Sequence, residues 1–93
     1  MFEFDLHDEL KRKLRKLSKK DRALKKAVDK KIEEVISRNT ETIEHYKNLH
    51  APLNEFKRVH VGSFVLTFKV YKEKNFVLFR TLRHHDEAYE GRK

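Results

Sequence analysis

Four side chains near the C-terminal end of the chain could bind a phosphate group and move a proton. They are Arg83, His84, His85 and Tyr89, and they follow a run of apolar residues that is typical of a central β-strand. A guanidinium group suits a phosphate because it presents several N–H donors in one plane. Histidine changes its charge near neutral pH, and tyrosine can also carry a proton. This combination predicts a site that binds or cleaves RNA.

The composition favours a polyanionic partner. The 93 residues include 23 Lys and Arg against 15 Asp and Glu, which gives a net charge of +8. Such an excess of basic residues indicates a nucleic acid or an acidic protein as partner. Cysteine is absent, which excludes disulfides and thiolate metal sites and suits a reducing cytoplasm. No apolar run reaches the length of a membrane span, and the chain length predicts one domain over residues 1–93.

The first half of the chain is predicted to be mainly helical. Apolar residues alternate with acidic ones over residues 2–6, which predicts a short strand. From residue 7 the apolar period becomes helical, and the first helix should end near Ser18. Ser18 and Asp21 fit a capping pattern, so Ser18 is expected to cap a second helix that stops at a left-handed Asn39. The short connection makes the two helices antiparallel neighbours.

The second half shows the pattern of a β-meander. After an extra helical turn at residues 40–46 and a loop, strands are expected over residues 56–61, 64–71 and 76–83. Gly62 and Ser63 form the first tight turn and residues 72–75 the second. A short helix should begin near His85 or Asp86. The sequence therefore predicts an α+β fold, in which an antiparallel sheet carries the helical hairpin on one face.

Alternation along the strands predicts which side chains share a face of this sheet. The face away from the helices is expected to be polar, basic and exposed, with Arg58, His60, Val65, Thr67, Lys69, Phe79, Thr81 and Arg83. Arg80 falls on the core side, where it must reach an edge or pair with a carboxylate.

The order of elements and a few short motifs resemble the RelE/ParE superfamily of toxins. The motif residues are Leu49, Pro52 and Leu53, then Arg58 and Gly62, then Arg83, His84 and Tyr89. The resemblance implies an antiparallel sheet with two helices on one face. It also implies the toxin of a type II toxin–antitoxin system, which in the RelE branch cleaves mRNA on the ribosome.

The resemblance also implies roles for individual residues. RelE-type toxins cleave RNA without a metal or other cofactor, by attack of its own 2′-hydroxyl, and need a base, an acid and cations around the phosphate. By position, Arg58 and His60 take places where the family has Lys or Arg, and Arg83 and Tyr89 match an arginine and a tyrosine of the C-terminal region. Residues expected to bind RNA are Lys57, Arg58, Lys69 and Arg83.

One departure from the family pattern concerns a phosphate-binding cation. The family commonly has arginine three residues after the hairpin glycine, where this chain has Val65. Arg80 is not expected to replace it, because alternation directs Arg80 to the other face. His84 and His85 could compensate as proton carriers. A metal site at these two histidines is not expected, since adjacent side chains point apart and no third ligand is near in sequence.

Three functions remain open on the sequence alone. The first is a ribosome-dependent mRNA endonuclease, and the second is a ParE-like toxin that inhibits DNA gyrase without catalysis. The third is a non-catalytic relative that binds RNA or an antitoxin. All three imply an acidic, RelB-like antitoxin as partner, whose amphipathic helix would cover the basic face or displace the C-terminal helix.

Overall fold

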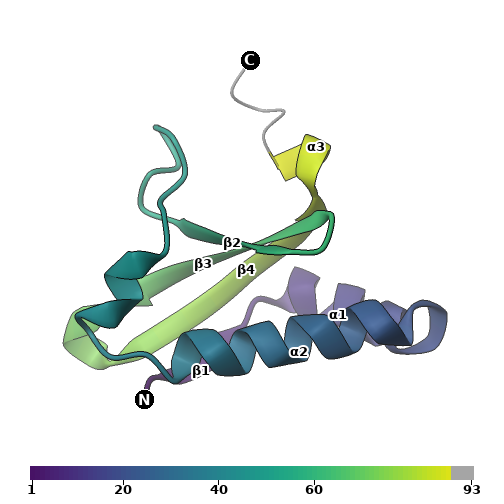
Figure 1. The fold of residues 1–93 in the computed structure, drawn as a ribbon, viewed down its shortest axis with the longest axis horizontal. Coiled ribbons are helices and arrows are strands. Elements are labelled where there is room, and N and C mark those ends of the chain that lie inside the picture. Colours follow the sequence, from purple (N-terminus) through teal and green to yellow (C-terminus); the bar gives the residue numbers. More distant parts are fainter. Residues whose placement is uncertain (89–93) are drawn as a thin grey trace.

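A computed structural model of the chain describes residues 1–88, and its elements follow the predicted order (Figure 1). Along the chain, two helices follow the first strand and precede the other three. In chain order the elements are β1 (Glu3–Leu6), α1 (Asp8–Lys20), α2 (Arg22–Ile36), the 3₁₀ turn η1 (Thr42–His45), β2 (Lys57–Val61), β3 (Phe64–Tyr71), the 3₁₀ turn η2 (Lys72–Lys74), β4 (Phe76–His84) and α3 (His85–Ala88). None of the described helices is both long and apolar enough to cross a membrane.

The four strands form one sheet in the order β1-β4-β3-β2. β2, β3 and β4 make the predicted antiparallel meander, and Gly62 takes the positive φ of 60° that its tight turn requires. β1 instead pairs parallel to β4, with Glu3 opposite Phe76 and Leu6 opposite Phe79. The predicted α+β fold is confirmed, but the sheet is mixed rather than purely antiparallel.

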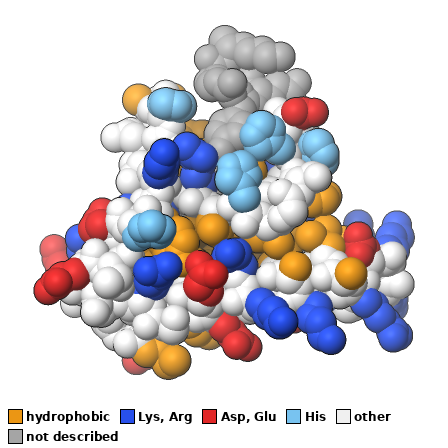
Figure 2. Space-filling view, in the orientation of Figure 1, with side chains coloured by type: hydrophobic (Ala, Val, Ile, Leu, Met, Phe, Trp, Pro, Cys, Tyr) orange, Lys and Arg blue, Asp and Glu red, His pale blue; other side chains and the backbone are white. Residues whose placement is uncertain are grey.

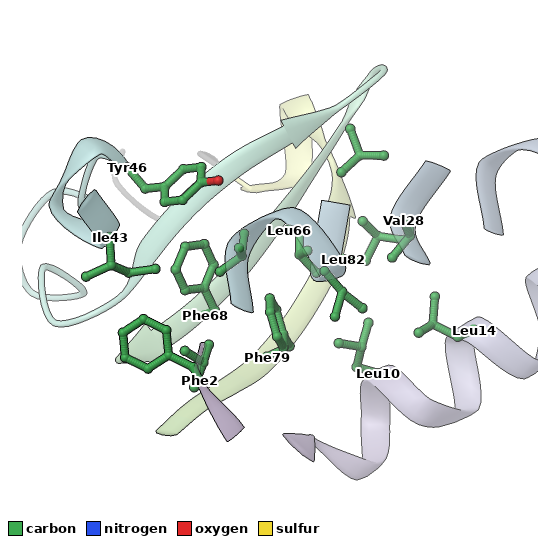
Figure 3. Packing of buried hydrophobic residues seen from close by; sticks show 14 residues of the cluster. Phe2, Leu10, Leu14, Val28, Ile43, Tyr46, Leu66, Phe68, Phe79 and Leu82 are labelled. Carbon is green, nitrogen blue, oxygen red and sulfur yellow. The ribbon is translucent and has the colours of Figure 1, made fainter. Parts of the chain in front are cut away.

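The two long helices cover one face of the sheet, and the core lies between these layers (Figures 1 and 3). Leu10 and Leu14 of α1 and Val28 of α2 point toward the strands, where Leu66 and Leu82 meet them. Each of these five side chains is at least 95% buried. Burial of a leucine or valine side chain contributes about 1.5–3 kcal/mol, so this layer is the main stabilising contact of the fold.

The ends of the second helix differ from the prediction. Asp21, and not Ser18, caps α2, because its carboxylate accepts the backbone N–H of Leu24 at 3.1 Å. The Ser18 hydroxyl donates to the carbonyl of Arg15 within α1. Asn39 is also not a left-handed stop, and its side-chain oxygen accepts the N–H of Thr42 at the start of η1. Ser18 and Asp21 are both good capping residues, and Asp21 caps α2 because it directly precedes the first residue of that helix.

A β-bulge at Arg80 changes the predicted faces of β4. Leu66 pairs with Leu82 and Thr67 with Thr81, but the next residue of β3, Phe68, pairs with Phe79. Arg80 is the extra residue, so the alternation of β4 is offset by one on its N-terminal side. The prediction for Phe79 was therefore wrong, since its ring is fully buried in the core against Phe68.

Two threonines stabilise the bulge from the other face. The hydroxyls of Thr67 and Thr81 lie 2.6 Å apart, and the Thr67 hydroxyl oxygen also accepts the N–H of Thr81 at 3.2 Å. The bulge thus places Phe79 among the apolar side chains of the core. It also directs Arg80 away from the core, so that the Arg80 side chain is exposed.

Candidate functional site

A cleft of about 200 Å³ opens on the face of the sheet that the long helices leave uncovered. In Figure 1 the loop before β2 and the helix α3 both rise on this side of the sheet. The cleft combines an apolar wall, a floor of hydroxyl groups and two arginines, and its lining residues are Leu49, Leu53, Phe56, Thr67, Arg80, Thr81 and Arg83.

Arg80 and Arg83 both line this cleft, which the sequence did not predict for Arg80. The Arg80 guanidinium carbon lies 5.4 Å from the centre of the Phe56 ring, a cation–π distance that leaves its charge intact. The Nη2 atom of Arg83 lies 3.7 Å from a carboxylate oxygen of Glu9, and the Arg83 side chain is about half exposed. The expectation that alternation directs Arg80 to the other face is therefore wrong, because the bulge brings it to the side of Arg83.

Two rows of paired residues cross this face of the sheet. One row is His60, Val65 and Arg83, and the other begins with Arg58 and Thr67. Neighbouring strands are about 4.8 Å apart, so the backbones at His60 and Arg83 are separated by roughly 10 Å. Val65, between them, is fully buried. The Val65 side chain is therefore enclosed by the protein and does not leave an open gap on this face.

The two adjacent histidines of the C-terminal region lie in different surroundings. His85 stacks on His60, with ring centres 5.5 Å apart and planes 23° from parallel. Its backbone N–H donates to the carbonyl of Ser63 at 2.8 Å, which fixes the start of α3. His84 instead contacts the ring of Phe64 edge-on at 5.6 Å. The site thus gains a pair of imidazoles, His60 and His85, on the side of β2.

The carboxylate of Asp86 lies near the imidazole rings of both His84 and His85. Its oxygens lie 3.8 Å from the Nδ1 atom of His84 and 3.7 Å from that of His85. Tyr89, the remaining residue of the predicted cluster, lies outside the described residues.

Two lysines predicted to bind RNA are engaged within the protein. The side chain of Lys57 is only 7% exposed, and its ammonium donates to Glu44, to the carbonyl of Tyr46 and to Asn48 at 3.0–3.1 Å. Lys69 donates to a carboxylate oxygen of Glu55 at 2.7 Å, and this hydrogen bond raises the pKa of Lys69. Lys57 ties η1 to the start of β2, a role that its place in a basic strand pattern did not reveal.

Arg58 and His60 also border a second, wider cleft between β2 and α2. Arg58 is half-buried at this edge of the sheet, and its backbone N–H donates to the carbonyl of Lys47. Across residues 1–88, no group of three or more His, Cys, Asp or Glu side chains is arranged to hold a metal ion. The candidate site therefore consists of an arginine cleft on β4 and an imidazole pair beside β2.

Comparison with known proteins identifies relatives of the whole chain. Residues 4–89 match the family described as the ParE toxin of the type II toxin–antitoxin system parDE. A protein of Methanocaldococcus jannaschii named "Putative toxin RelE4" is 45% identical and covers 100% of this chain and 96% of its own. An uncharacterized protein of Methanosarcina mazei is 36% identical, over 96% of this chain and all of its own.

Two solved structures share the fold at low sequence identity. A metal-bound toxin from Helicobacter pylori aligns with a TM-score of 0.72 and 21% identity, over 94% of this chain and 98% of its own. The isolated RelE toxin of E. coli aligns with a TM-score of 0.68 and 19% identity over both complete chains. These likenesses concern the arrangement of the helices and the sheet.

Proposed function

This chain belongs to the RelE/ParE family of toxins of type II toxin–antitoxin systems, and we propose that it is a cytoplasmic, ribosome-dependent mRNA endonuclease. The observation that carries the proposal is the pairing of Arg80 with Arg83 in one cleft beside the stacked imidazoles of His60 and His85. A toxin that only bound a protein target would have no need of proton-transfer groups next to a phosphate-binding cleft.

The proposed reaction is an attack of a ribose 2′-hydroxyl on the adjacent phosphodiester. The 2′-oxygen loses its proton to a base and forms a bond to phosphorus, while the bond from phosphorus to the 5′-oxygen breaks. An acid protonates the departing 5′-oxygen, which leaves a 2′,3′-cyclic phosphate and a 5′-hydroxyl. The extra negative charge on the five-coordinate phosphorus is stabilised by cations placed in advance around it.

The described residues supply most of these functions. Arg83 and Arg80 hold the phosphate. His60 lies two strands away from Arg83 and stacks on His85, and this pair accepts or donates a proton. Phe56, Leu49 and Leu53 offer an apolar wall on which an unpaired base can stack. We assign no part to His84, because it packs against Phe64 away from the cleft.

Membership of the family implies an antitoxin partner. We infer that this partner is acidic, because the chain carries a net charge of +8. An antitoxin that covered the arginine cleft would compete with the negatively charged RNA backbone for the same guanidinium groups. Ribosomes and translated mRNA are the further partners that the proposed activity requires.

The proposal is tested by adding the purified protein to a translation reaction and mapping mRNA ends by primer extension. We expect cleavage of the translated message, reduced on the order of 100-fold in rate by Arg83→Ala. The matched control is Arg12→Ala, since Arg12 is an exposed arginine of α1. Intact translated mRNA at every concentration of the wild-type protein would refute the proposal, and inhibition in a parallel gyrase supercoiling assay would then favour a ParE-like activity.

A further inference from the structure

A cleft of about 460 Å³ between α2 and the outer edge of β2 carries a concentration of positive charge. Its lining includes four permanent cations, Lys31 from α2, Arg38 just after that helix, Lys47 from the loop and Arg58 from β2, against one carboxylate, Glu34. In Figure 2, Lys, Arg and His side chains lie on both sides of the apolar band between α2 and the sheet. Four cations against one carboxylate leave an excess of three positive charges.

The single carboxylate is already occupied within the protein. The Tyr46 hydroxyl donates to Glu34 at 2.5 Å, and the ammonium of Lys31 donates to its other oxygen at 3.1 Å. The hydrogen bond from Tyr46 lowers the pKa of Glu34, while Arg38 rests on the ring of Tyr46 at 5.1 Å. Arg38 thus contacts the neutral Tyr46 side chain directly, and the nearby Glu34 carboxylate attracts it without a hydrogen bond between them.

The remaining cations are positioned by the backbone. The N–H of Arg58 donates to the carbonyl of Lys47 at 2.9 Å, which keeps these two basic residues side by side at the edge of the sheet. Lys47 is exposed to solvent. These two neighbouring cations, together with Arg38 just after α2, fit an anion with several separated charges, rather than one small ion.

The cleft also connects with the proposed catalytic face. His60 borders it and at the same time stacks on His85. Arg58 pairs across the sheet with Thr67, which lines the arginine cleft. A chain of phosphates could therefore run from Arg83 across the sheet to Arg58 at the edge of β2.

We propose that the α2–β2 cleft binds the phosphate backbone of single-stranded RNA on one side of the cleaved bond. The choice of RNA as the ligand rests on the proposed function, whereas the charge and continuity of the cleft stand on the structure alone. In this arrangement the arginine cleft holds the reacting phosphate, and Arg38 and Lys47 hold phosphates further along the strand.

The proposal is tested by the salt dependence of RNA binding. Wild-type protein and the variant Arg38→Gln/Lys47→Gln are titrated into a fluorescent 12-nucleotide 2′-O-methyl RNA, which cannot react, and the affinity is measured by anisotropy. The control variant, Lys16→Gln/Lys30→Gln, removes the same charge from exposed lysines of the helices outside the cleft. Thermal unfolding of all three proteins establishes that each is folded.

Each phosphate contact contributes about 0.7 to the slope of log affinity against log salt for a single strand. Loss of two contacts should reduce the magnitude of the slope by about 1.4. If the variant and the wild type bind equally at 1 M salt, the variant should therefore bind roughly 25-fold more weakly than the wild type at 0.1 M. Equal slopes and affinities for the cleft and control variants, or no binding of the wild type, would overturn the proposal. So would a cleft variant that loses affinity only for polyglutamate, because the cleft would then serve an acidic protein.

This experiment separates the inference from the proposed nuclease activity. Binding of the unreactive RNA is measured without any cleavage, so a protein that binds through the cleft but leaves mRNA intact would support the cleft and refute the nuclease. If the variant Arg38→Gln/Lys47→Gln cleaved mRNA as fast as the wild type and bound the unreactive RNA equally well, the nuclease would be supported and the role of the cleft refuted.

Discussion

Replacement of Arg80 by alanine should slow RNA cleavage almost as much as replacement of Arg83. Both guanidinium groups line the same cleft, and the bulge gives Arg80 its place there. Removal of one group that stabilises the charge of a transition state typically slows a reaction by about 10²- to 10³-fold, or roughly 2.7–4 kcal/mol. We therefore expect Arg80→Ala to retain at most about 1% of the wild-type rate.

The same change should have only a small effect on folding. Arg80 is exposed, and its contact with the ring of Phe56 is worth about 0.5–1 kcal/mol at such a site. A loss of 1 kcal/mol lowers the melting temperature of a domain of this size by about 4–8 °C. The expected loss of activity is several times larger in free energy, so it cannot arise from unfolding at moderate temperature.

The assay compares the rates at which wild type, Arg80→Ala, Arg80→Lys and Arg83→Ala cut translated mRNA, under conditions where each ribosome is cut once. Arg80→Lys should recover part of the rate, because an ammonium retains the charge but not the paired donors of a guanidinium. The reasoning would be refuted if Arg80→Ala cleaved within threefold of the wild type while Arg83→Ala lost its activity. The bulge would then serve the packing of Phe79 alone.

Four other substitutions have effects that follow from the surroundings of single residues. His85→Ala should slow cleavage of translated mRNA at least tenfold and His84→Ala less than threefold, because only His85 stacks on His60. Tyr46→Phe should lower stability at pH 7 by about 1 kcal/mol, since the Tyr46–Glu34 hydrogen bond is partly open to water. That bond lowers the pKa of Glu34 below 4.5, and burial raises the pKa of Tyr46 above 10.0. In thermal unfolding, the wild type should therefore show its full stability between pH 4.5 and pH 10.0 and lose stability below and above this range. These losses should be smaller in Tyr46→Phe. Val65→Arg should destabilise the protein by about 3 kcal/mol in urea unfolding and bring no gain in cleavage, because its position is fully buried.

Much of the fold could be predicted because each element has a strong local pattern. The helical spacing of Leu10 and Leu14, the turn at Gly62 and the extent of the strand over residues 64–71 all correspond to observed structure. The expectation that Val65 and Thr67 are exposed was wrong, since both are buried. The parallel pairing of β1 could not be predicted, because an alternating strand has the same pattern in either orientation. The cap of α2 was misassigned because Ser18 and Asp21 are both good capping residues within one turn of each other.

The candidate site was harder to predict, and the reason lies in β4. Its first four residues, Phe76–Phe79, are all apolar, so they give no alternation from which a change of face could be detected. The sequence pattern therefore does not reveal the bulge at Arg80, although the bulge determines which arginines share a cleft. Lys57 presents the opposite case, since a basic residue in a strand looks exposed until its three internal acceptors are known.

The parallel pairing of β1 with β4 also determines when an active molecule can exist. Synthesis runs from the N-terminus, so Glu3–Leu6 cannot find their partners until Phe76–Phe79 have left the ribosome. The helices α1 and α2 need only local contacts and can form much earlier. Arg80 and Arg83 are made later still, which means that a nascent copy carries no assembled arginine cleft toward the ribosome that is making it. The interval before the sheet closes is also the time in which an antitoxin could bind the incomplete chain.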